Sequence, residues 1–216
     1  MALLLIEHHA DVLAKKNAGA TALHGAAQGG HDAMARLLIE HQADVSSKNI
    51  AGMTALFLGA VGGHETTVRL LIELGADVSA KAEDGMSALS WAALRGQETV
   101  TRLLIELGAD VSAKDMCGST ALFEASYAGH ETLVRLLLDT GADEQTKRRD
   151  GKTPEDVATE QGHHQVAAML KAEGVRRAQC VAFAMGHQER LGEGTWVEEL
   201  DAGIVRMVLE KVALEL

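Results

Sequence analysis

Histidines are the residues whose number and spacing first suggest chemistry in this sequence. The chain has ten, and four of them recur at one regular position, namely His31, His64, His130 and His163. Imidazole side chains bind zinc or transfer protons in catalysis. A shared zinc ion would need its ligands about 2 Å away, whereas neighbouring packed helices lie roughly 8–10 Å apart. We therefore expect these imidazoles to cap the turns between helices, and we predict no metal site.

Other catalytic arrangements are also missing from the sequence. It has no Gly-x-Ser-x-Gly motif, no phosphate-binding loop and no local pair of carboxylates that would form a cleft. The two cysteines, Cys117 and Cys180, show no metal-ligand spacing and cannot make a disulfide framework. We predict no catalytic residue, no cofactor and no enzyme activity. The rival hypothesis is an enzyme subunit whose catalytic part precedes Met1.

The structural elements that position the histidines recur every 33 residues. Five glycines show this period: Gly19, Gly52, Gly85, Gly118 and Gly151. After each of the first four glycines, a Thr or Ser stands where its hydroxyl can cap a helix N-terminus, for example Thr54 or Ser87. A short Ala-rich helix follows and ends at a glycine such as Gly63. A second helix has apolar residues at helical spacing, and a polar, turn-rich finger leads to the next unit. The period therefore predicts a solenoid of helix pairs.

This order resembles the ankyrin repeat, whose pattern runs Gly-x-Thr-Pro-Leu-His, two antiparallel helices, then Gly-Ala-Asp-Val. The resemblance covers about residues 1–174. Alanine replaces the motif proline in the first four units, only Thr153-Pro154 keeps it, and the motif histidine survives only as His24. The resemblance implies an all-α repeat fold, an ankyrin-type solenoid of helix-turn-helix units with β-hairpin-like fingers and a short helical C-terminal extension.

The units predict two parts of the chain. Residues 1–174 form the ankyrin-repeat domain, with an N-terminal half repeat, four full repeats beginning near 17, 50, 83 and 116, and a degenerate C-terminal repeat. Because the chain begins inside a second helix, we expect N-terminal repeat sequence to be missing. Residues 175–216 form the helical extension, with one helix near 176–185 and another containing Leu200, Ile204, Val208, Val212 and Leu216. The extension either caps the last repeat or recruits a second protein.

Charge limits the classes of partner. The chain has 31 acidic and 20 basic residues and a formal net charge of −11, which argues against nucleic acid or an anionic membrane as the main partner. Second helices carry ladders such as Glu65, Arg69 and Glu73, which we interpret as a solvated outer face, or else an acidic stripe for a basic partner. The basic run over residues 147–152 is a solvated loop or a grip for an acidic segment. The short apolar N-terminus does not match a signal peptide, so we expect an intracellular, cytoplasmic or nuclear protein.

The partner site is predicted from positions that escape the repeat. Ankyrin stacks generally bind through their fingers and the inner face of the first helices, and in the middle units these positions are unusually apolar. Exposed apolar patches mark binding surfaces, and Trp and Tyr are common hot-spot residues. We predict that the following residues bind a partner: Ile50, Met53, Met86, Trp91, Leu94, Arg95, Met116, Ser119 and Tyr127. For Trp91 in particular, the alternative is packing between neighbouring repeats.

Together these observations predict a non-catalytic protein–protein interaction scaffold, a monomer that binds another protein through its concave finger and first-helix surface. No nucleic acid, membrane or small-molecule substrate is expected as a partner. The alternative is a substrate-recognition adaptor whose C-terminal helical tail recruits a second complex such as a ubiquitin ligase.

Overall fold

A computed structural model describes residues 12–16 and 18–184 of the chain, with side chains described up to residue 180. Its helices are α2 (Ala22–Gln28), α3 (Asp32–Glu40), α4 (Ala55–Gly62), α5 (Glu65–Glu73), α6 (Ala88–Leu94), α7 (Glu98–Glu106), α8 (Ala121–Ala128), α9 (Glu131–Asp139), α10 (Pro154–Glu160) and α11 (His164–Ala184). The predicted all-α repeat fold is confirmed.

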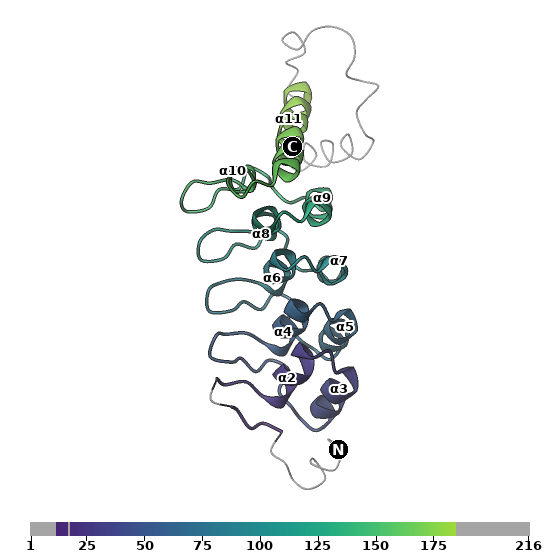
Figure 1. Ribbon diagram of the computed structural model, residues 1–216. Helices are drawn as coiled ribbons and strands as arrows, with labels where there is room; N and C mark the ends of the chain where they lie inside the picture. Colours follow the sequence, from purple (N-terminus) through teal and green to yellow (C-terminus); the bar gives the residue numbers. More distant parts are fainter. Residues whose placement is uncertain (1–11, 17, 185–216) are drawn as a thin grey trace. The chain divides into compact units, whose positions relative to one another are not determined.

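The chain divides into two compact units, residues 1–167 and 168–216. Within the first unit, the first helices α2, α4, α6 and α8 stack in one row, and the second helices α3, α5, α7 and α9 stack in another beside it (Figure 1). The fingers project from the side of the first helices, away from the second row (Figure 1). In the part of the chain that the structure describes, the fingers hold one isolated antiparallel bridge, between Lys81 and Ser87.

First helices begin at the hydroxyl residues that the sequence indicates. The side chain of Ser87 accepts a hydrogen bond from the Ser90 backbone N–H at 3.1 Å, and Thr54 and Thr120 cap α4 and α8 in the same way. These bonds satisfy helical N–H groups that otherwise lack a partner. At the start of α10, Thr153 forms a capping box with Asp156, with Pro154 as the first helical residue.

The one retained motif histidine, His24, links a helix start to the next finger. Its Nδ1 accepts from the Thr21 backbone N–H at 3.1 Å, which leaves Nε2 to donate to the Met53 carbonyl oxygen at 3.0 Å. Burial lowers the pKa of His24, so the neutral tautomer that these two bonds require is favoured.

Left-handed glycines stop the first helices. Gly129 ends α8 with φ +75°, and a Cβ there would lie 2.5 Å from Nδ1 of His163. Both the backbone conformation and the close approach of the next unit therefore require glycine at this position.

The core lies between the two rows of helices. Leucines of first and second helices, such as Leu56, Leu71, Leu89 and Leu104, are buried to 1% exposure or less. Alanines such as Ala60 and Ala92 are fully buried on the first helices, so their small side chains let neighbouring first helices approach closely. Each unit thus completes its core only against its neighbours, as expected for a solenoid.

Three sets of hydrogen bonds join consecutive units. Nε2 of His130 donates to the Leu94 carbonyl oxygen at 3.2 Å, and the equivalent donors bond one unit back in the same way: His64 to Gln28, Gln97 to Val61 and His163 to Tyr127. Lysine ammonium groups reach forward to finger carbonyls, as from Lys81 to Lys114 at 2.8 Å. Finger backbones also pair with one another, as from Glu83 N–H to Ala51 carbonyl at 2.9 Å.

The prediction that these imidazoles cap the turns between helices is therefore wrong. His31, His64 and His130 occupy helix N-cap positions, but their side chains make no capping hydrogen bond. The imidazoles of His64, His130 and His163 bond to the first helix of the preceding unit instead. Among the residues described, no group of three His, Cys, Asp or Glu side chains could hold a metal ion.

The C-terminal helix α11 is continuous over His164–Ala184, so it has no break at residue 174. The division between the two compact parts of the chain falls within this helix, at residues 167 and 168. Glu173 pairs with Arg176 at 3.1 Å and with Arg177 at 3.4 Å, which supports the helix on both sides of Gly174. The domain boundary at 174 stays a prediction. Residues 1–11 of the half repeat predicted over about 1–16, the predicted helix containing Leu200 to Leu216, and residues 185–216 of the predicted extension lie outside the described residues. No described helix is long and apolar enough to cross a membrane.

Candidate functional site

The predicted partner residues lie on the surface made by the fingers and the first helices, which we call the finger face. Ile50, Met116 and Tyr127 are 74%, 57% and 45% exposed, and Arg95 is also exposed. Met53, Trp91 and Leu94 are half-buried. Met86 and Ser119 are buried, so these two contribute little side-chain surface to the finger face.

The burial of Met86 and Ser119 follows from their place at the base of a finger. Their carbonyl oxygens accept the hydrogen bonds that close the finger, from the Ala82 N–H and the Asp115 N–H respectively. Each residue immediately precedes the helix cap, where the finger folds back onto the stack. The same position holds Met53, which is half-buried.

Exposed apolar side chains lie at two fingertips. The backbone N–H of Ile50 bonds to the Ala18 carbonyl oxygen and that of Met116 to the Asp84 carbonyl oxygen. These contacts use backbone atoms only, and both side chains are exposed. The finger between them carries the exposed acidic residues Glu83 and Asp84, so apolar and acidic tips alternate along the finger face.

Trp91 packs against the preceding unit and keeps part of its ring at the surface. Its ring lies edge to face against Phe57 of the preceding first helix, with ring centroids 6.1 Å apart. The Arg95 guanidinium lies 5.9 Å from its ring centroid. Its indole N–H is buried and, within the described part of the chain, has no hydrogen-bond partner. Trp91 therefore packs between units while its half-buried ring also borders the finger face.

Glu124, at the position equivalent to Trp91 one unit later, is a candidate site residue that the sequence-based list omits. The pKa of its carboxyl is raised to about 7, mainly by burial and in addition by the charges of Asp115 and Asp84. A hydrogen bond from the Ser119 side chain and the charge of Arg148 act in the opposite direction. The signal available in the sequence was the change from Gly25, Leu58 and Trp91 to a carboxylate at this position.

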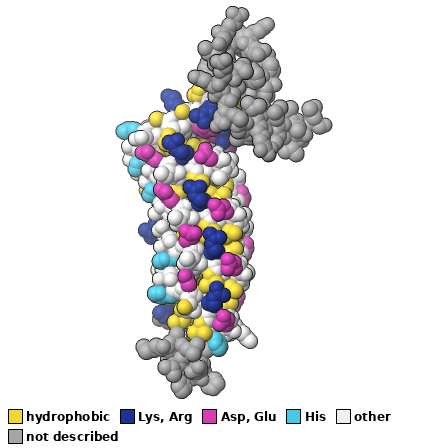
Figure 2. Space-filling view, turned by 90° about the vertical axis from the view of Figure 1, so that its right-hand side faces the viewer, with side chains coloured by type: hydrophobic (Ala, Val, Ile, Leu, Met, Phe, Trp, Pro, Cys, Tyr) yellow, Lys and Arg dark blue, Asp and Glu magenta, His cyan; other side chains and the backbone are white. Residues whose placement is uncertain are grey.

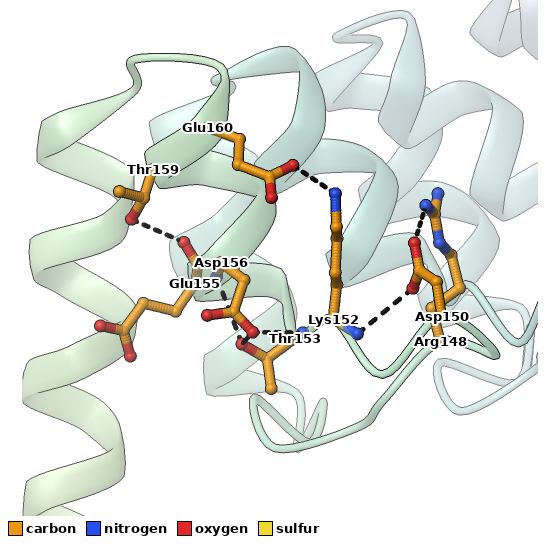
Figure 3. A network of polar contacts seen from close by, with 8 residues as sticks. All are labelled: Arg148, Asp150, Lys152, Thr153, Glu155, Asp156, Thr159 and Glu160. Atoms are coloured by element: carbon orange, nitrogen blue, oxygen red, sulfur yellow. Dashed lines mark hydrogen bonds and ion pairs between the residues drawn. The ribbon is translucent and has the colours of Figure 1, made fainter.

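The basic last finger has local partners for two of its charges (Figure 3). Arg148 pairs with Asp150, and Lys152 pairs with Glu160 of α10 at 2.6 Å. Arg148 also lies 4.9 Å from the ring centroid of Phe123, and its hydrogen bond lowers the pKa of Asp150 to about 2. These contacts favour the interpretation of a structured, solvated loop.

The outer face of the second helices carries both basic and acidic side chains. Basic side chains follow one column along these helices, with acidic side chains on both sides (Figure 2). Arg69 pairs with Glu65 at 3.4 Å within α5. Other ladder acids bond across units instead: Asp32 accepts from the Thr67 hydroxyl and Glu98 from the Thr132 hydroxyl. Because several of these acids are engaged within the chain, the contacts favour a solvated outer face over an acidic stripe for a basic partner.

Comparison with known proteins identifies a family model that matches most of the chain. A family model described as "Ankyrin repeats (3 copies)" matches residues 1–82, 47–115 and 89–178, which together span most of the chain. No curated protein matches the sequence. The matched segments contain all the finger-face residues named above.

Proposed function

The chain belongs to the ankyrin repeat family, whose repeats are generally protein–protein interaction modules, and from this we propose that it is a non-catalytic scaffold that binds a partner protein through its finger face. The observation that carries the proposal is the exposure of Ile50, Met116 and Tyr127. Several exposed apolar side chains on one face are typical of a binding surface, and Tyr is common among hot-spot residues.

The fingers are held in place before any partner binds. Backbone bonds join neighbouring fingers, as from Met116 N–H to Asp84 carbonyl at 3.0 Å, and Lys48 and Lys81 extend to carbonyls of the next finger. A surface fixed in this way loses little conformational entropy on association. Preorganisation therefore supports binding by the finger face rather than by a segment that folds on its partner.

The non-catalytic part of the proposal rests on how the charged side chains of this face are used. Arg148 and Lys152 form ion pairs that hold the last finger. Asp115 accepts bonds from the backbone N–H groups of Cys117 and Ser119, each at 2.8 Å, and so shapes its own finger. These side chains support the loop structure of a binding face.

Quantitative affinity capture from a lysate of the source cells tests the proposal. The baits are the full chain, a finger-face variant with Ile50→Ala, Met116→Ala and Tyr127→Ala, and a control with Leu74→Ala and Leu107→Ala. Leu74 and Leu107 are also exposed apolar residues, 36% and 38% accessible, but they follow the second helices. We expect proteins that are recovered by the full chain and the control, and lost with the finger-face variant. Equal recovery by all three baits would overturn the proposal.

A further inference from the structure

We propose that the finger face binds a partner segment that carries a lysine or arginine side chain next to apolar residues, with the cation placed against Asp84, Asp115 and Glu124. The apolar neighbours of that cation would contact Met116 and Tyr127. This inference rests on the proposed function and names the chemistry of the partner. The observations that carry it are two finger carboxylates, Asp84 and Asp115, the half-buried carboxyl of Glu124 near them, and the exposed apolar side chains of Met116 and Tyr127.

In the last finger, an arginine side chain pairs with the aspartate at the position equivalent to Asp84. Asp84 and Asp150 occupy equivalent positions two units apart, and each accepts a hydrogen bond from the backbone N–H two residues later. Two residues before Asp150 stands Arg148, which pairs with it. Two residues before Asp84 stands Ala82. Among the residues that the structure describes, no cation pairs with Asp84 or with Asp115.

The charges of Asp84 and Asp115 act on the carboxyl of Glu124. Glu124 reaches from α8 to the finger base, where the Ser119 side chain hydrogen-bonds to it and the charges of Asp115 and Asp84 disfavour its ionisation. Arg148 is the nearby cation that favours ionisation, but its guanidinium is already paired with Asp150. A cation from a partner would relieve this repulsion, and complementary charge of this kind selects partners and speeds association.

The apolar surroundings favour a long cationic side chain over a small ion. Met116 and Tyr127 are exposed. Met116 follows Asp115 in the same finger, Tyr127 lies three residues after Glu124 in α8, and half-buried Trp91 lies on the preceding first helix. Lysine and arginine have apolar stems that pack on such surfaces while their charged ends reach acidic groups. The finger face therefore matches both parts of these side chains.

Selection from a random peptide library tests the proposal, with the purified full chain as bait and the selected peptides resynthesised as probes. The test variant combines Asp84→Asn, Asp115→Asn and Glu124→Gln. Asparagine preserves the finger turn, because Asn49 at the position of Asp115 accepts the same two backbone bonds. The matched control combines Asp77→Asn, Asp110→Asn and Glu106→Gln, which removes the same number of carboxyl groups. Asp77 and Asp110 also cap turns through backbone N–H groups, at 2.8 Å each.

We expect peptides selected on the full chain to be enriched in lysine or arginine beside apolar residues. Their dissociation constants, measured by fluorescence anisotropy, should rise about tenfold or more with the test variant and change little with the control. Circular dichroism confirms that both variants keep their helices. Peptides without an excess of basic residues, or an equal loss in test and control variants, would overturn the proposal.

The same peptides separate this inference from the proposed function. If binding is lost with the Ile50, Met116 and Tyr127 alanine variant but not with the neutralised carboxylates, the finger face binds partners. In that case the proposed contact between a partner cation and the carboxylates is wrong. If no selected peptide responds to either set of substitutions, both proposals fail.

Discussion

The ring of Trp91 lies edge to face against that of Phe57, with centroids 6.1 Å apart, and so joins two neighbouring first helices. Such aromatic pairs contribute about 0.5–1.5 kcal/mol beyond the area that they bury. Since Trp91 is only half-buried, we expect Trp91→Ala to lower the free energy of unfolding by about 1–3 kcal/mol. Trp91→Phe, which keeps an aromatic edge, should cost clearly less. Equilibrium unfolding in urea followed by circular dichroism measures both, and equal losses would show that the contact with Phe57 is not the cause.

The hydrogen bond from His130 to the Leu94 carbonyl predicts a specific pattern of rescue. Removing it with His130→Ala should destabilise the chain by about 1 kcal/mol. His130→Gln should recover much of that loss, because Gln97 bonds to Val61 from the equivalent position at 3.3 Å. Urea unfolding of the three proteins tests this. A glutamine variant as unstable as the alanine variant would show that ring packing, rather than the hydrogen bond, stabilises the junction.

Two glycine substitutions separate backbone strain from steric conflict. Gly129 and Gly141 both have positive φ, +75° and +94°, so alanine at either should cost about 1–2 kcal/mol in backbone strain. A Cβ at Gly129 would also meet the His163 ring, whereas nothing lies within 4 Å of one at Gly141. We therefore expect Gly129→Ala to lower the thermal midpoint more than Gly141→Ala. The reverse order would contradict the close packing of His163.

The carboxyl of Glu124 predicts a pH dependence with a definite sign. Its pKa is about 7 in the folded chain against 4.5 for the free group, so the folded state holds a proton that the unfolded state has released. This group therefore lowers stability as the pH rises from about 4.5 to about 7, and the full penalty is present above pH 7.

We accordingly expect Glu124→Gln to be more stable than the parent chain at pH 8, by about 1 kcal/mol after allowing for solvent screening. The difference should shrink toward pH 4.5. Urea unfolding at several pH values measures it, and carboxyl carbon NMR gives the pKa directly. Glu106→Gln, on the exposed side of α7, serves as the control. A constant difference across this pH range would contradict the raised pKa.

Much of the fold could be predicted because its determinants are local. Hydroxyl residues such as Thr54 and glycines such as Gly63 mark where helices begin and end, and both recur with the period. The unbroken helix across Gly174 was not predicted, because the glycine and the end of the repeat period both suggested a boundary there. The pairs of Glu173 with Arg176 and Arg177 offset part of the cost of the glycine.

The site was harder to predict, because its properties depend on neighbouring units. The exposure of Ile50 and Met116 at turn positions agrees with the pattern of the sequence. The burial of Met86 depends on how its finger folds back onto the stack, and the raised pKa of Glu124 depends on its burial and on the charges of Asp115 and Asp84 from two fingers. The bond from His130 to Leu94 joins residues 36 positions apart, which local spacing cannot reveal.

The pairing of fingers through backbone atoms has an evolutionary consequence. The N–H donors of these bonds belong to Ile50, Glu83, Met116 and Arg149, which occupy one equivalent position of the repeat. An apolar, an acidic, a flexible and a basic side chain are thus accepted there without changing the bond, and only proline would abolish it. Mutations at the fingertips can therefore change what the surface recognises while the scaffold is inherited intact, and selection can act on recognition and on stability almost independently.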